Sequence, residues 1–145
     1  MANREWSMAE LQSKAQAYCA AAEHCPQDLQ QKIYQWGGTA EQANTIIAAL
    51  KSDGFMDEQR YCNAFVHDKL LYQGWGRVKL RAALSAKRLP ENCIDEAIRN
   101  IDEADYFSVL QRLVAQKKGV RPEQGVRFLL QRGFTFNEIR RFVDF

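Results

Sequence analysis

The stretch TAEQANTIIAAL at residues 39–50 returns in outline as PENCIDEAIRNI at residues 90–101 and as TFNEIRRFV at residues 135–143. The apolar residues of each stretch recur at steps of three, one and three, the last set being shorter: Ala43, Ile46, Ile47 and Leu50; Ile94, Ala97, Ile98 and Ile101; Ile139, Phe142 and Val143. These steps place every member of a set on one side of a helix with 3.6 residues per turn. The pattern therefore predicts three short helices, each burying one stripe.

The residues around each stripe indicate that a larger unit repeats. A large aliphatic residue stands 13 positions before the second member of each set, as Ile33, Leu84 and Leu129. Two of the helix starts are capping boxes, Thr39 with Gln42 and Thr135 with Glu138, in which a hydroxyl and a longer side chain satisfy free N–H groups. Pro90 takes the equivalent place in the middle stretch, where a proline loses no helical hydrogen bond. A repeat of this kind constrains the fold more than any single motif.

Reading outward from the stripes predicts an all-α protein of nine helices in three tandem three-helix repeats. Each repeat has a long helix, at about 7–23, 57–72 and 102–117, followed by a helix that ends near Gly37, Arg88 or Gly133. The predicted boundaries are residues 1–56, 57–101 and 102–145. Units this small cannot bury all their apolar faces alone, so we expect them to pack in series as an elongated array.

Composition favours a soluble globular chain. Of its 145 residues 46% are hydrophobic and 26% are charged, and no apolar run reaches the ~18 residues that span a bilayer. The first six residues include the polar and charged Asn3, Arg4 and Glu5, and no apolar segment follows them, so we expect a cytoplasmic protein without membrane association. We also expect a monomer. The four cysteines are then expected to stay reduced.

The sequence does not predict a catalytic or metal centre. Cys19, His24 and Cys25 come closest to a zinc cluster, but their spacing is wrong for one and the other thiols are distant. Cys62 and Cys93 fall on or beside apolar helix faces, where a buried thiol is inert. The Gly-x-Gly at residues 74–76 lacks the further residues of a nucleotide loop. We therefore expect no enzyme activity, no cofactor and no metal.

Basic residues gather in the second and third predicted repeats. Residues 69–89 contain six lysines and arginines and no acid: Lys69, Arg77, Lys79, Arg81, Lys87 and Arg88. A second group follows: Lys117, Lys118, Arg121, Arg127 and Arg132. Such clusters fit an anionic partner, although a solvated helix face is the simpler interpretation. Tyr72 and Trp75 could stack on single-stranded bases or lie in the core.

The stretch DGFMDEQRYCNAFVHDKLLYQGWGRVKLRAALSAKRLP at residues 53–90 resembles the RecX family, bacterial regulators of the RecA recombinase. The matching positions are Gly54, Phe55, Met56, Asp57, Arg60, Tyr61, Phe65, Gly74, Gly76, Leu80 and Leu84. The resemblance implies tandem three-helix units, in agreement with the repeat. Two departures are Arg88, where the family commonly has glycine at a helix end, and Cys62, where it has alanine.

The resemblance implies a protein that binds the RecA filament on DNA and inhibits RecA ATPase, strand exchange and the DNA-damage response. Phosphates of single-stranded DNA within the filament are a further expected contact. The candidate partner-binding residues are Arg60, Arg77, Lys79, Arg81, Lys87, Arg88, Lys117, Lys118 and Arg127. Arg60 could instead pair with Asp57, one turn before it. For most of the other matching residues, caps, turns and core packing are a sufficient explanation.

Two other functions fit the residues. Three-helix units can act as helix-turn-helix readers, and the arginines at 77 and 81 follow a glycine turn, as they would at the start of a recognition helix. The chain would then be a stand-alone DNA-binding protein. A protein-only scaffold is the remaining alternative.

Overall fold

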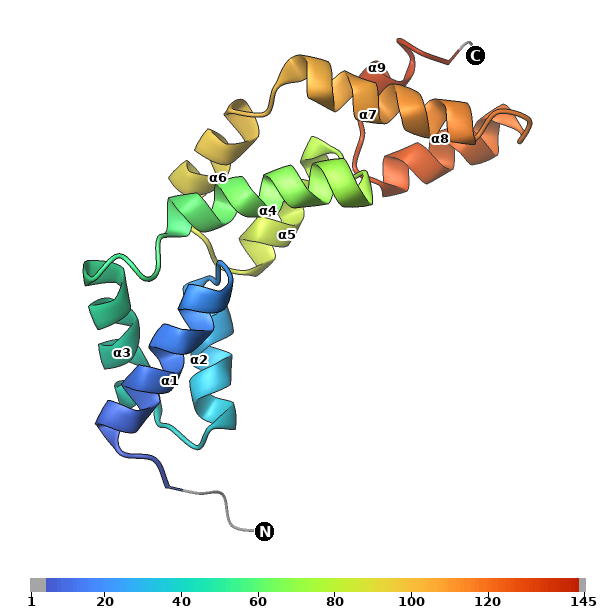
Figure 1. Ribbon diagram of the computed structural model, residues 1–145. Coiled ribbons are helices and arrows are strands. Elements are labelled where there is room, and N and C mark those ends of the chain that lie inside the picture. The colour runs from blue at the N-terminus through green and yellow to red at the C-terminus, as the bar shows by residue number, and fades with distance from the viewer. Residues whose placement is uncertain (1–4, 144–145) are drawn as a thin grey trace. The chain divides into compact units, whose positions relative to one another are not determined.

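The computed structural model describes residues 5–143, and this part of the chain forms nine α-helices and no strands (Figure 1). The helices are α1 (Met8–Ala21), α2 (Pro26–Gln35), α3 (Ala40–Ser52), α4 (Glu58–Gln73), α5 (Arg77–Ala86), α6 (Glu91–Arg99), α7 (Glu103–Gln116), α8 (Pro122–Gln131) and α9 (Phe136–Ile139). The all-α prediction is confirmed, and the three long helices lie where the sequence predicts them.

Contacts between residues divide the chain into two compact units, Met1–Tyr61 and Cys62–Phe145. The first unit contains a three-helix bundle in which α1, α2 and α3 all contact one another. Its core is apolar throughout: Leu11, Ala15, Cys19, Leu29, Ile33, Ala43, Ile46, Leu50 and Met56. Removing these side chains from water is the main source of the unit's stability.

The second unit contains most of α4 and all of α5 to α9. In it α5 packs on α6, α7 on α8, and α8 on α9. The predicted boundary between the second and third repeats, at 101/102, thus falls inside one compact unit. The division into three domains stays a prediction, because the contacts alone separate only two units.

Each stripe that defines the repeat has a buried part and a half-buried part. The buried members are Ala43, Ile46, Leu50, Ile94, Ala97 and Ile139, and the half-buried ones are Ile47, Ile98, Ile101, Phe142 and Val143. Ile33, Leu84 and Leu129, the aliphatic residues upstream of the stripes, are at most 1% exposed. The helix starts also agree: Thr39 accepts a hydrogen bond from the N–H of Gln42 at 3.2 Å, and the third stripe begins with the same exchange. Pro90 is the N-cap of α6, and its carbonyl accepts from two residues of the first turn.

The helix of the third stripe is shorter than predicted, because the apolar spacing predicts a helix that continues to Val143. The helix α9 ends at Ile139, and the N–H of Phe142 bonds the carbonyl of Ile139, three residues back rather than four. Phe142 therefore lies on a tighter turn beyond the helix, and Val143 follows that turn. Both are nevertheless half-buried.

The end of α5 explains how the fold accommodates Arg88 where the resemblance leads us to expect glycine. Gly37 after α2 and Gly133 after α8 have positive φ values of 89° and 99°, and Arg88 has φ 60° at the matching position. The N–H of Leu89 bonds the carbonyl of Leu84 at 3.4 Å, closing the hydrogen-bonded turn that also ends the other two helices. Among residues 5–143, Arg88 is the one non-glycine residue with positive φ.

Candidate polyanion-binding surface

The charge of the chain is unevenly divided between the two units. Residues 1–61 contain five lysines and arginines against eight acidic residues, whereas residues 62–145 contain fifteen against ten. The candidate surface for an anionic partner is therefore in the second unit. Which of its cations are available depends on the contacts that each one makes within the unit.

Arg77 lies in a network within the second unit. Its guanidinium pairs with Glu138 at 3.2 Å and with Glu103, and lies 3.9 Å from the centroid of the Tyr106 ring. The phenol of Tyr106 accepts a hydrogen bond from the Arg77 N–H and donates one to Glu138, each at 3.1 Å. Burial raises the pKa of this tyrosine strongly. Arg77 thus ties α5 to α7 and α9.

Two other predicted contact residues also have carboxylate partners within their own unit. Arg81 pairs with Asp95 on α6 at 2.6 Å. Arg60 pairs with Glu23, and its Nη2 also donates to the carbonyl of Gly54 at 3.3 Å. Asp57 does not pair with the guanidinium; it caps α4 by accepting from the backbone N–H of Arg60 at 2.8 Å.

Trp75, just before α5, has a lysine over its ring from each of the two neighbouring helices. The Nζ of Lys69 on α4 lies 5.0 Å from the ring centroid, and the Nζ of Lys79 on α5 lies 4.5 Å from it. The edge of Phe65 contacts the same indole, at a centroid distance of 6.1 Å. Neither lysine has a carboxylate partner within residues 5–143, so the ring fixes their position while their charge stays uncompensated.

The same arrangement recurs on α8. Phe128 has the guanidinium of Arg132 5.0 Å from its centroid and the Nζ of Lys117 at 4.0 Å. Arg132 also donates to the carbonyl of Gln73 at 2.8 Å, which joins α8 to the end of α4. We call the residues of the two ring sites together the cation–aromatic strip. Its members are Lys69, Trp75, Lys79, Arg132, Phe128 and Lys117.

Close backbone contact holds the two halves of the strip together. The N–H of Gly76 donates to the carbonyl of Arg132 at 2.7 Å, and that of Val78 donates to Gly133 at 3.1 Å. A Cβ on Gly76 would lie 2.5 Å from the carbonyl carbon of Gly133, so only glycine fits there. The glycine that the sequence assigns to a turn therefore also lets α5 begin against the end of α8.

This docking bears on the helix-turn-helix alternative. At the start of α5 the N–H groups of Gly76, Arg77 and Val78 all donate within the unit, to the carbonyl of Arg132, the Tyr106 phenol and the carbonyl of Gly133. A recognition helix presents its first residues to DNA. Here those donors, and the guanidinium of Arg77, are already occupied.

The structure places the remaining predicted contact residues at several points of the second unit. Lys118, Arg127 and Arg88 are exposed, and Lys87 is half-buried at the end of α5. The strip brings together two predicted residues, Lys79 and Lys117. It also contains Lys69 and Arg132, which belong to the basic stretches but are not among the predicted contacts. The signal in the sequence is an aromatic residue four positions earlier on the same helix face, Phe65 before Lys69 and Phe128 before Arg132.

The two aromatic residues considered for base stacking, Tyr72 and Trp75, differ in exposure. Tyr72 is 75% exposed, whereas Trp75 is half-buried under its two lysines. None of the four cysteines, all within residues 5–143, is in a disulfide bond. Cys62 is buried, and burial with the nearby Glu23 carboxylate raises the pKa of Cys19. Within residues 5–143 no group of side chains has the composition of a metal site, and no helix is long and apolar enough to span a membrane.

The fold and this surface define a class: a helical protein of tandem three-helix units with a basic, aromatic-lined face. A sequence model of the second three-helix domain of RecX matches residues 57–98. The regulatory protein RecX of Chlorobaculum tepidum is 30% identical over 132 residues, which cover 86% of this chain and 80% of that protein. That of Thermus thermophilus is 32% identical over 106 residues, covering 73% and 70%. The chain belongs to the RecX family of regulatory proteins.

Solved structures agree with this assignment at the level of the fold. The crystal structure of RecX from Lactobacillus salivarius has a TM-score of 0.79 and 15% identity, with 93% of each chain covered. A second RecX crystal structure has a TM-score of 0.75 and 19% identity, covering 97% of this chain and 81% of the other. The arrangement of helices is thus shared across sequences that have diverged widely.

Proposed function

We propose that this chain is a non-enzymatic regulator that binds the RecA–DNA filament and inhibits RecA ATPase, strand exchange and the downstream DNA-damage response. The observation that carries the proposal is the cation–aromatic strip, taken together with membership of the RecX family. The strip has four cations held over rings with no carboxylate partner within residues 5–143. A surface of this composition suits phosphate or acidic protein groups.

We further propose that Lys79, Lys87, Arg88, Lys117, Lys118 and Arg127 contact the filament, with Lys69 and Arg132 added to them. Arg77 and Arg81 have carboxylate partners in the second unit, and Arg60 has one in the first. A direct contact by any of these three would have to displace or share that partner. For Arg77 we propose a positioning role, holding α5 against α7 and α9.

Stand-alone recognition of duplex DNA is the weaker alternative. The first donors of α5 are satisfied within the unit, and the strip offers charge and ring faces rather than a row of base-reading amides. The experiment below separates the two by including DNA binding without RecA.

The test measures RecA's DNA-dependent ATPase against increasing concentrations of this protein. The key variant combines Lys69→Glu with Lys79→Glu, which reverses both charges over Trp75. Its matched control combines Lys14→Glu with Lys32→Glu in the first unit, because those lysines also lie over aromatic rings, of Trp6, Trp36 and Tyr18. We expect the strip variant to need about tenfold more protein for half-inhibition and the control to stay near wild type.

Three outcomes would count against the proposal. Wild-type protein that leaves the ATPase unchanged would refute the regulatory role itself. Equal inhibition by the strip variant and the control would refute the assignment of the surface. Tight, sequence-dependent binding to labelled duplex DNA without RecA would favour the alternative. Helical content from circular dichroism checks that both variants remain folded.

A further inference from the structure

The second unit also contains a groove that shares Lys117 with the cation–aromatic strip but is lined mainly by aliphatic side chains. The end of α7, the turn to α8 and the residues after α9 enclose an open groove of about 490 Å³. Its lining is mainly aliphatic and includes Val114, Val126 and Leu129 together with Phe142, which we call the floor. A groove of this volume is large enough for a side chain or two of a bound ligand.

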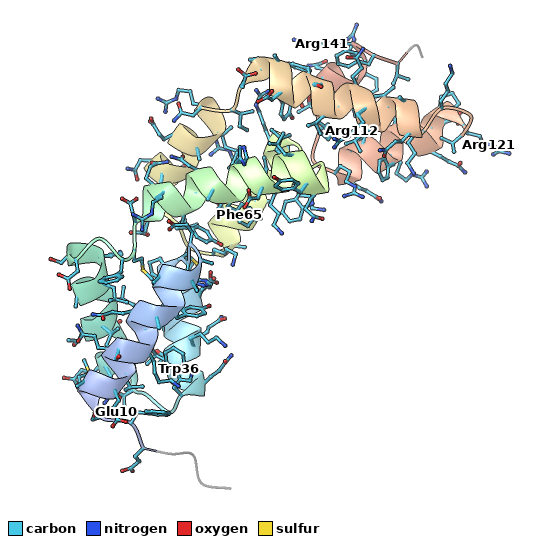
Figure 2. The ribbon with its side chains drawn as sticks, viewed as in Figure 1. Glu10, Trp36, Phe65, Arg112, Arg121 and Arg141 are labelled. Carbon is cyan, nitrogen blue, oxygen red and sulfur yellow. The ribbon has the colours of Figure 1, made fainter. Side chains whose placement is uncertain are left out.

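The rim of the groove carries only positive charge. Lys117, Lys118 and Arg121 line it, and no aspartate or glutamate does. Lys118 and Arg121 are exposed and have no carboxylate partner within residues 5–143; Figure 2 shows Arg121 at the turn between α7 and α8, directed away from both helices. Between residues 112 and 143 there are eight lysines and arginines against Glu123 and Glu138, and the latter is bound to Arg77 and Tyr106.

Gly125, the fourth residue of α8, adds an independent observation. Its φ is not positive, so its backbone conformation does not call for glycine. A Cβ there would meet only the Cβ of Lys117 at 3.8 Å and the Cγ2 of Val120 at 3.9 Å, which are ordinary contacts. Glycine in a helix is unfavourable relative to alanine, and neither packing nor backbone geometry requires it here. What glycine does provide at this position is space in the groove that it lines.

We propose that the groove binds a short acidic amphipathic segment of a protein partner. Apolar side chains of the segment enter the floor opened by Gly125, and its carboxylates face Lys118 and Arg121 at the rim. A protein segment fits better than a nucleic acid because the floor presents aliphatic side chains, with Phe142 the one aromatic ring among the lining residues. Base stacking uses aromatic faces, and the groove offers only Phe142 among mainly aliphatic lining residues, whereas the strip has Trp75 and Phe128.

The test uses a short fluorescein-labelled peptide with leucines on one helical face and glutamates on the other. A scrambled peptide of the same composition and a single-stranded oligonucleotide of similar charge serve as controls. Fluorescence anisotropy with the full chain, in the absence of RecA, should show saturable binding of the amphipathic peptide that weakens with salt. Binding of neither peptide, or of both equally, would overturn the proposal. Because the strip can bind the oligonucleotide by itself, the groove would be assigned to nucleic acid only if the oligonucleotide displaced the bound peptide.

Two sets of variants locate the binding. Lys118→Glu combined with Arg121→Glu should raise the dissociation constant of the peptide about tenfold, because it reverses the rim charge. Gly125→Leu should raise it similarly by filling the floor, and Gly125→Ala should raise it less while increasing the melting temperature. If the Gly125 variants gain stability with no loss of peptide affinity, the groove is not the binding site. Because RecA is absent, failure here leaves the ATPase test of the proposed function unaffected.

Discussion

The phenolic oxygen of Tyr106 donates to the carboxylate of Glu138 at 3.1 Å, and the same oxygen accepts the backbone N–H that begins α5. Glu138 meanwhile accepts from the N–H of Thr135 at 2.8 Å as part of its own capping box. One carboxylate thus caps α9 and, through Tyr106 and Arg77, fixes the start of α5. Tyr106 is fully buried, so every group in this network must find its partner within the protein.

Tyr106→Phe is expected to lower the free energy of unfolding by about 2 kcal/mol, because it leaves the backbone N–H of Arg77 without its acceptor and removes one of the two hydrogen bonds to Oε1 of Glu138. Urea denaturation followed by circular dichroism measures the change. The matched control is Tyr72→Phe, which removes the same oxygen from a side chain that is 75% exposed and should change stability by less than about 0.5 kcal/mol. Equal effects of the two substitutions would contradict the network.

The same hydroxyl predicts a dependence on alkaline pH. Burial raises the pKa of Tyr106 above the ordinary tyrosine value of 10.0. Below that value the phenol is protonated in both the folded and the unfolded chain, so its stabilising contribution is complete. At higher pH the unfolded chain loses the proton first, and the free energy of unfolding falls by up to about 1.4 kcal/mol per pH unit.

The measurement compares wild type with Tyr106→Phe, because the contributions of all other groups are common to both proteins and cancel in the difference. The stability difference between them should be constant below about pH 9 and should shrink as the pH approaches about 11. A difference that stays constant across that range would mean that Tyr106 is not buried as a neutral phenol.

Gly76→Ala is expected to destabilise the protein by at least about 2 kcal/mol, since its Cβ would lie 2.5 Å from the backbone of Gly133. The two turns would have to separate, which also lengthens the hydrogen bond from Gly76 to Arg132. Gly125→Ala is the control: a glycine of the same unit with room for a Cβ should gain about 0.5 to 1 kcal/mol on the same change. Thermal unfolding of both variants tests whether the loss of stability comes from the close backbone contact at Gly76 rather than from the replacement of any glycine.

The contrast between these contacts and the helices shows what the sequence could and could not predict. Period, caps and glycines are local signals, and they located the long helices, the buried stripes and the ends of α2, α5 and α8. The pairing of Arg77 with Glu138 spans 61 residues, and that of Arg132 with Gln73 spans 59. Such contacts depend on how the helices dock, which the sequence does not show. Counting charges therefore predicts Arg77 as a partner contact, although it is paired within the unit, and does not identify Lys69 and Arg132.

Arg88→Gly is expected to raise the free energy of unfolding by up to about 1 kcal/mol. Arg88 has φ 60°, a left-handed conformation in which a Cβ is unfavourable, although the greater freedom of glycine in the unfolded chain offsets part of the gain. Arg88→Ala removes the same charge without relieving the backbone and should not stabilise. If Arg88→Gly lowers the melting temperature, the side chain makes a contact that outweighs its backbone strain.

Substitutions can distinguish two roles for Arg60, an ion pair with Glu23 and a direct contact with the filament. Its pair with Glu23 is partly exposed, with side chains 47% and 32% accessible, so Arg60→Gln should lower the free energy of unfolding by less than about 1 kcal/mol. If the pair is its main role, Glu23→Gln should cost about the same, and the double variant should cost little more than either single one. All three should inhibit RecA ATPase as wild type does. A loss of inhibition with Arg60→Gln but not with Glu23→Gln would instead make Arg60 a direct contact with the filament.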